Sequence, residues 1–203
     1  MRVQLYLATL VLAYTCGGSL LAQEAMPEMP KPSKEHGVLK KEVGDWDVEM
    51  KAWMGPGDPI VSKGTEHNEM IGGFWCISKY EGAFAGQPFV GSATMGYDSS
   101  KGVYTGSWVD SISPAPMHMT GKFDDSTKTM TWRTEGMGPD GQPVVGKMVV
   151  TYTDDDHRTM TMFNPAGPGG EMMKVMEAKY SRKVEKRKTK MPSSIGISQG
   201  SDS

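Results

Sequence analysis

The chain of 203 residues carries 22 basic and 24 acidic side chains, which leaves a formal net charge of −2. This length suits one domain, large enough to bury a core without disulfides or metal. The apolar fraction of 37%, taken with 25 glycines, argues against global disorder of the chain.

Leucine is distributed unevenly along the chain. Six of the seven leucines lie in the first 21 residues, and Leu39 is the only one beyond them. Helical proteins depend on leucine, whereas strands favour Val, Ile, Thr and aromatic residues. The remainder of the chain is rich in Thr, Val, Trp and Tyr, with turn residues throughout, which predicts an all-β domain.

Residues 1–22 have the pattern of a secretory signal peptide. Arg2 provides a positive start, residues 5–14 are apolar, and small residues precede Gln23. The apolar stretch is too short for a transmembrane anchor. We therefore predict an exported protein, periplasmic or extracellular, for which nucleic acid is not an expected partner. Lipid anchoring at Cys16 is the alternative, although the residues before it fit a lipobox poorly.

A proline-rich linker is predicted for residues 23–33, ahead of a barrel domain over residues 34–183. Ser33 is expected to cap a short helix over Lys34–Val43, which Gly44 ends. A short helix in front of the first strand of a barrel commonly closes one end of it.

About ten strands are predicted, mostly in hairpins. The first is the clearest, because Trp46, Val48 and Met50 alternate with charged residues. Strand lengths and turn spacing are typical of an antiparallel barrel or sandwich. The expected strands cover residues 46–54, 61–70, 74–81, 89–97, 103–110, 117–123, 129–135, 144–153, 157–164 and 172–182.

The centre of this pattern is the hairpin Gly86–Ser111. Its turn, Tyr97–Gly102, contains Asp and Ser, which bond their own backbone, and Gly, which accepts a positive φ. The connection is too short for a parallel crossover, so the two strands must be antiparallel.

Residues 184–203 are predicted to be a basic, then Ser- and Gly-rich, disordered tail. Six basic residues lie between Arg182 and Lys190, interrupted by one acidic residue. The run is interpreted as a solvated extension; contact with an anionic lipid or polysaccharide surface is the alternative.

Several short motifs, in their order and spacing, resemble an exported bacterial family known as domain of unknown function 1579. The resemblance covers residues 32–183 and implies a calycin-like, lipocalin-type antiparallel barrel; Gly44-x-Trp46 is similar to the Gly-x-Trp that opens the first lipocalin strand. The resemblance to this family implies no catalytic residues. The motifs are Glu35-His36-x-x-Leu39, Gly44-x-Trp46, Gly86-Gln-Pro-Phe89, Gly96-Tyr-Asp98, Trp108-x-Asp110 and Met176-Glu177 with Tyr180-x-Arg182.

Methionine is the most distinctive candidate for a binding surface, with 18 residues in the chain. Copper(I) binding by Met117-His118-Met119 is disfavoured, since adjacent side chains of a strand point to opposite faces. Methionine is therefore interpreted as a flexible core residue that would make any cavity adaptable.

Other sites are predicted to be absent or inert. The histidines have no metal spacing: His36 and His157 are expected to be solvated, whereas His67 and His118 are candidates for the interior. Cys76 is expected to be a buried, unreactive thiol. No metal, cofactor or catalytic constellation is predicted.

The leading hypothesis is that the barrel binds a small, largely apolar ligand in its interior. The alternative is a filled barrel that serves as an envelope or surface interaction module; an enzyme acting on a lipid-like or small ester substrate has no residue pattern behind it. The expected lining residues are Trp46, Met50, Met95, Trp108, Met119, Met160 and Met176, with Arg133 or Glu177 as polar contacts.

Overall fold

The computed structural model describes residues 28–138, 140–167 and 169–183. The predicted signal peptide and C-terminal tail, and residues 23–27 of the proline-rich linker, lie outside these residues. None of the helices in the described part of the chain is long and apolar enough to cross a membrane.

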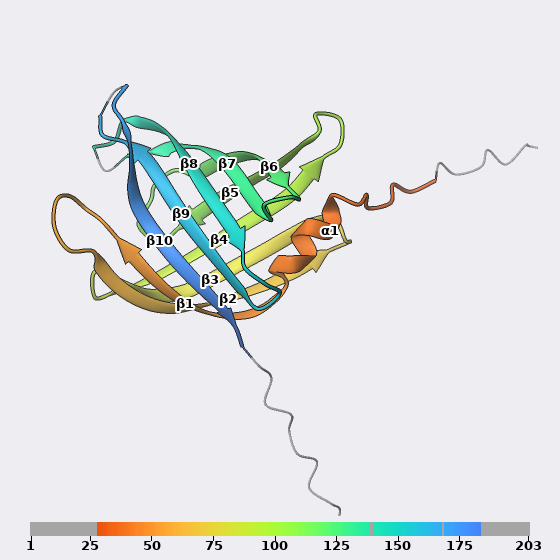
Figure 1. Cartoon of the computed structure of the whole chain (residues 1–203), viewed down its shortest axis with the longest axis horizontal. Coiled ribbons are helices and arrows are strands. Elements are labelled where there is room, and N and C mark those ends of the chain that lie inside the picture. Colours follow the sequence, from red (N-terminus) through yellow and green to blue (C-terminus); the bar gives the residue numbers. More distant parts are fainter. Residues whose placement is uncertain (1–27, 139, 168, 184–203) are drawn as a thin grey trace, which may run out of the picture. The chain divides into compact units, whose positions relative to one another are not determined.

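Ten antiparallel strands close into a barrel, in which each strand pairs with the next and β1 pairs with β10 (Figure 1). This confirms the predicted fold class. The elements are α1 (His36–Leu39), the 3-10 helix η1 (Lys40–Glu42), β1 (Gly44–Ala52), β2 (Ile60–Ile71), β3 (Trp75–Phe84), β4 (Gln87–Asp98), β5 (Val103–Asp110), β6 (Met117–Asp124), β7 (Thr129–Met137), β8 (Pro143–Tyr152), β9 (His157–Pro165) and β10 (Met172–Arg182).

The inner face of the barrel follows the alternation seen in the sequence. In β1, Trp46, Val48 and Met50 are buried, whereas Asp47 and Glu49 are exposed. Successive side chains of a strand point to opposite faces, so one apolar residue in every two is enough to line the interior. The clear pattern of β1 is what allowed its inner face to be predicted.

Three turns at one end of the barrel share the same aspartate geometry. The Asp98 carboxylate accepts hydrogen bonds from the backbone nitrogens of Ser100 and Lys101, at 3.0 and 3.2 Å. Asp124 and Asp154 likewise accept a bond from the backbone nitrogen two residues further on. These aspartates stabilise turns by bonding the local backbone, as predicted for Asp98.

The N-terminal helix closes this same end of the barrel, but it is shorter than predicted. Ser33 does not cap it; instead, the Ser33 backbone nitrogen donates to Nδ1 of His36 at 3.0 Å. At the end of η1, which follows α1 directly, the carbonyl of Glu42 accepts from Trp46 Nε1 at 2.8 Å and from Asn68 Nδ2 at 2.9 Å. Side chains of the barrel thus donate hydrogen bonds to a carbonyl that, in a longer helix, would have accepted a bond from the helix backbone.

His36 corrects the expectation that this histidine is solvated. It is buried, and its ring meets those of Phe74 and Tyr97 edge-on, at centroid distances of 5.3 and 5.8 Å. The helix turns the imidazole toward the barrel because the same face carries Leu39, which is 2% exposed. His36 is therefore part of the seal between helix and barrel.

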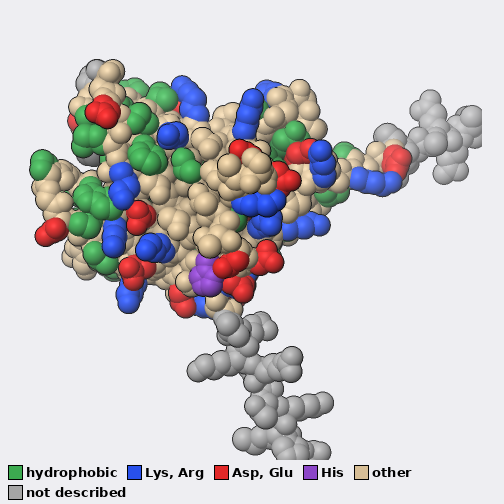
Figure 2. Space-filling model, in the orientation of Figure 1, with side chains coloured by type: hydrophobic (Ala, Val, Ile, Leu, Met, Phe, Trp, Pro, Cys, Tyr) green, Lys and Arg blue, Asp and Glu red, His purple; other side chains and the backbone are tan. Residues whose placement is uncertain are grey.

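The opposite end of the barrel carries an apolar rim. Large apolar side chains are exposed on or beside its loops: Met54, Ile112, Met137, Met172 and Met173. Hydrophobic side chains gather on the left of Figure 2, where the β1–β2 loop and the β9–β10 end lie in Figure 1. The two ends therefore differ in chemistry, with polar turns and a helix at one and an apolar rim at the other.

Candidate ligand site in the barrel interior

The barrel is hollow. Its interior holds a cavity of about 340 Å³, with Leu39 and Glu42 at the helical end and the apolar rim at the other. At the rim, Ile112 and Met137 line the cavity and are 61% and 51% exposed. The walls are mainly methionine and aromatic side chains: Met50, Phe84, Phe89, Met95, Trp108, Met117, Met119, Met130, Trp132, Met148, Met160, Met162 and Met176.

A buried ion cluster forms the floor. The Arg158 guanidinium is 3% exposed and lies 2.8 Å from an oxygen of Glu42 and 2.5 Å from an oxygen of Glu66. The Tyr152 hydroxyl bonds to Glu42, and Asn68 donates to Glu66 at 2.8 Å. Removing one partner of such a cluster would leave a buried charge uncompensated, at a cost of about 3–5 kcal/mol.

Burial changes the ionisation of this floor. Desolvation raises the pKa of the Glu66 carboxyl, although Arg158 and Asn68 act in the opposite direction. Burial lowers the pKa of Arg158, but Glu42 and Glu66 more than compensate, so that it lies above its ordinary value. The guanidinium therefore stays charged and holds the two carboxyl groups together.

Trp46 separates this floor from a second cationic group outside the barrel. The guanidinium carbons of Arg158 and Arg182 lie 4.1 and 4.0 Å from its ring centroid. Two guanidinium groups cannot share one ring face at that distance, so they enclose the indole. Trp46 was predicted to line the cavity, but it lies beneath the floor and is 1% exposed.

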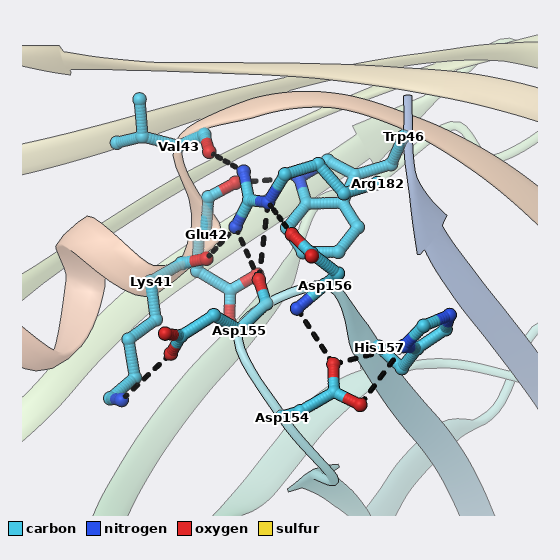
Figure 3. A network of polar contacts seen from close by, with 9 residues as sticks. All are labelled: Lys41, Glu42, Val43, Trp46, Asp154, Asp155, Asp156, His157 and Arg182. Carbon is cyan, nitrogen blue, oxygen red and sulfur yellow. Dashed lines mark hydrogen bonds and ion pairs between the residues drawn. The ribbon is translucent and has the colours of Figure 1, made fainter. Parts of the chain in front are cut away.

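Arg182 joins the last strand to the start of the first (Figure 3). It donates to the carbonyls of Val43, Lys41 and Asp155 and to the Asp156 carboxylate. A Cβ at Gly44 would lie 2.6 Å from Nη1 of Arg182, and Gly44 has a φ of +120°. The glycine of the Gly-x-Trp motif is thus explained in two ways: the Arg182 side chain lies against the Gly44 backbone, and the backbone conformation at Gly44 favours glycine.

A family model described as "Protein of unknown function (DUF1579)" matches residues 31–182. The chain belongs to this family. A search of curated proteins found no significant match.

The solved structures show the calycin-like fold of this DUF1579 member. Rv2717c from M. tuberculosis is similar over 76% of this chain and 100% of its own, with 10% identity and a TM-score of 0.56. The S-type phycobiliprotein lyase CPES from Guillardia theta is similar over 77% of this chain and 100% of its own, with 12% identity and a TM-score of 0.50. At these identities the similarity concerns the fold alone.

Six of the nine predicted site residues line the DUF1579 cavity: Met50, Met95, Trp108, Met119, Met160 and Met176. Arg133 and Glu177 correct the prediction of polar contacts in the interior, because both lie on the outer face. Arg133 pairs with Glu135 there, and Glu177 with Lys174. Their sequence neighbours Trp132 and Ala178 occupy the inner face, and alternation places the charged residues outside.

The histidines proposed for the interior also point outward. His67 and His118 are exposed, and His67 Nδ1 lies 2.7 Å from Asp45 Oδ1. His157 is exposed, as predicted, beside Asp154. Within the described ranges, no group of three or more His, Cys, Asp or Glu side chains is placed to hold a metal ion.

Cys76 is fully buried, as expected from its apolar neighbours. Burial raises the pKa of its thiol to about 12, with Glu42 and Glu66 acting in the same direction. Reactivity toward electrophiles requires the thiolate, which this environment suppresses.

Sequence reasoning missed the three charged residues of the floor. In β2 both faces are polar, so alternation could not identify Glu66 as an inward residue. A signal for Arg158 was present, since it lies in phase with Met160 and Met162 in β9. Glu42 ends the 3-10 helix η1, whose orientation depends on the barrel end that it helps to close.

Proposed function

We propose that this barrel binds a small, largely apolar molecule in its interior. The observation that carries the proposal is the hollow, methionine-lined cavity that reaches an apolar rim. Its volume lies at the lower end of the range of about 300–1,000 Å³ that is usual for ligand sites. A filled interaction module, the alternative function, would require a packed interior instead.

The character of the walls supports a ligand bound mainly by apolar contact. Methionine side chains are unbranched and polarizable, so they adapt to an irregular shape. Burial of apolar surface contributes about 25 cal/mol per Å² before the costs of association. The aromatic side chains Phe84, Phe89 and Trp108 near the rim offer larger contact surfaces.

The test is native mass spectrometry of the protein purified from its own host, alongside two variants. Met148 lines the cavity, and Met148→Trp would fill part of it. Thr131, on the neighbouring strand β7, is exposed, so Thr131→Trp adds the same volume outside. We expect a co-purifying small molecule in the wild type and in Thr131→Trp, and its loss in Met148→Trp. Repeated absence of any such molecule from the wild type would contradict the proposal.

We also propose that the protein acts after export, as the pattern of residues 1–22 predicts. A carrier outside the cytoplasm would meet apolar molecules that its interior could shelter from water.

A further inference from the structure

Carboxyl groups outnumber basic groups in the cavity lining by three to one. Glu42, Glu66 and Asp110 line it, and Arg158 is the single Lys, Arg or His side chain among its lining residues. Charges in a space walled off from water act over longer distances than they would in bulk solvent. The lining therefore carries a bias against an anionic ligand.

The Arg158 guanidinium is poorly placed to form an ion pair with an anionic ligand. Its two terminal nitrogens already face Glu42 and Glu66. The faces of its guanidinium are covered by Trp46 and Tyr180, with the guanidinium carbon 4.1 and 4.2 Å from the two ring centroids. An anion at the floor would have to displace a carboxylate from this cluster.

Asp110 brings a carboxylate to the mouth of the cavity. Its oxygens accept hydrogen bonds from Trp108 Nε1 at 2.8 Å and from the Ile112 backbone nitrogen at 3.0 Å. The Ser113 hydroxyl lies 3.1 Å from the same carboxylate. These bonds hold the group at the rim, and its half-buried position leaves it open to a ligand.

We propose that the cavity selects an amphiphile with a cationic head, such as a primary alkylamine, over a carboxylate with the same chain. The apolar tail lies among the methionines, and the ammonium group lies at the mouth beside Asp110. In this orientation the polar floor stays intact, and the head group keeps contact with water. The inference rests on the proposed function of the preceding section.

Isothermal titration calorimetry with decylamine, decanol and decanoate, each below its aggregation concentration, tests the selection. We expect decylamine to bind at least about tenfold more tightly than decanoate, with decanol between them. Asp110→Asn keeps an acceptor for Trp108 and should reduce the ratio of amine to carboxylate affinity at least about fivefold. Asp58→Asn, in the exposed β1–β2 loop, removes the same charge outside the cavity and should leave the ratio unchanged.

A second variant covers the case in which Asp110→Asn does not fold. Ala115 lines the cavity on the β5–β6 loop, and Ala115→Lys should shift the preference toward decanoate. Equal binding of the three probes, or tightest binding of decanoate to the wild type, would overturn the inference and leave apolar ligand binding standing. If none of the three probes binds, both the inference and the proposed function are contradicted.

Discussion

The Trp46 side chain contacts both the buried ion cluster inside the barrel and the strand ends where the barrel closes. Arg158, on the cavity side, and Arg182, at the end of the last strand, enclose its ring, and its indole nitrogen bonds to the carbonyl of Glu42. Stacking of a cation on an aromatic ring contributes about 0.5–2 kcal/mol, depending on desolvation. The residue joins the helix, the first strand and the last strand.

The planar guanidinium of Arg182 should be hard to replace. Arg182→Lys keeps the charge but replaces three donor nitrogens by one, and so loses most of the bonds to Val43, Lys41 and Asp155. We expect the free energy of unfolding to fall by about 1–3 kcal/mol in urea denaturation. Arg133→Lys, on the exposed outer face, should change it by less than about 0.5 kcal/mol. Equal losses in the two variants would contradict this role of Arg182.

At the scale of the elements, β2 and β3 approach closely where two glycines pair. Gly64 and Gly82 lie opposite each other, and the Tyr80 side chain covers both. A Cβ at Gly64 would clash with the Tyr80 hydroxyl oxygen and would lie 2.6 Å from the carbonyl oxygen of Glu81. The glycines therefore make room for an aromatic ring that lines the cavity.

Gly64→Ala should force Tyr80 out of place and distort the strand pair. We expect a loss of about 1–3 kcal/mol in the free energy of unfolding, as for other overpacked positions. Gly37→Ala, in α1, is the matched control, because nothing lies within 4 Å of a Cβ there. That variant should be neutral or stabilised by up to about 1 kcal/mol. A Gly64→Ala variant as stable as the wild type would show that Tyr80 moves aside freely.

The turn between β4 and β5 should make the stability of the fold depend on pH in the acid range. Hydrogen bonds from Ser100 and Lys101 hold the pKa of Asp98 at about 2, below its ordinary value of 3.8. Between pH 3.8 and about 2, the unfolded chain therefore binds more protons at Asp98 than the folded protein does. The contribution is complete above pH 3.8 and is lost as pH falls through 2.

Asp98→Ala should remove this part of the pH dependence. We expect the melting temperature of the variant to fall less steeply than that of the wild type between pH 4 and about 2, while it is lower than the wild type at neutral pH. Asp58→Ala, in an exposed loop, is the control for loss of one negative charge. Parallel curves for the wild type and Asp98→Ala would contradict the assignment.

At the scale of the whole molecule, the ten strands close a hollow barrel with two different ends. The helical end is sealed by Leu39, His36 and the ion cluster, and the other end presents the apolar rim. The two ends give the cavity a direction, so the head group of a bound amphiphile lies either at the floor or at the mouth. The proposed site is therefore a property of the closed barrel rather than of any single strand.

Export is the prediction that concerns the entire chain. In its own host, the protein should be found outside the cytoplasm with Gln23 as its first residue, as measured by fractionation and intact mass. Ala22→Tyr places a bulky residue before the expected cleavage site and should leave an uncleaved precursor. Ala25→Tyr, just after the site, is the control and should be processed normally. An unprocessed wild-type chain in the cytoplasm would contradict the prediction.

Much of the fold could be predicted from the chain alone, because the relevant signals are local. Alternating residues in the first strand and turn residues such as Asp98 act over a few positions, and they indicated ten antiparallel strands. The same alternation identified six of the residues that line the cavity. It could not show that the interior is hollow, since that depends on how side chains from all strands fill one volume.

Tertiary structure alone brought the charged floor together. Glu42, Glu66 and Arg158 lie far apart in the chain, and they meet only because β1 pairs with both β2 and β10 and so closes the barrel under the helix. A carboxylate in a polar strand has no sequence signal for burial, since its cost is offset by a partner that is remote in sequence. Arg133 and Glu177 could be placed outside only once the face of each strand was known.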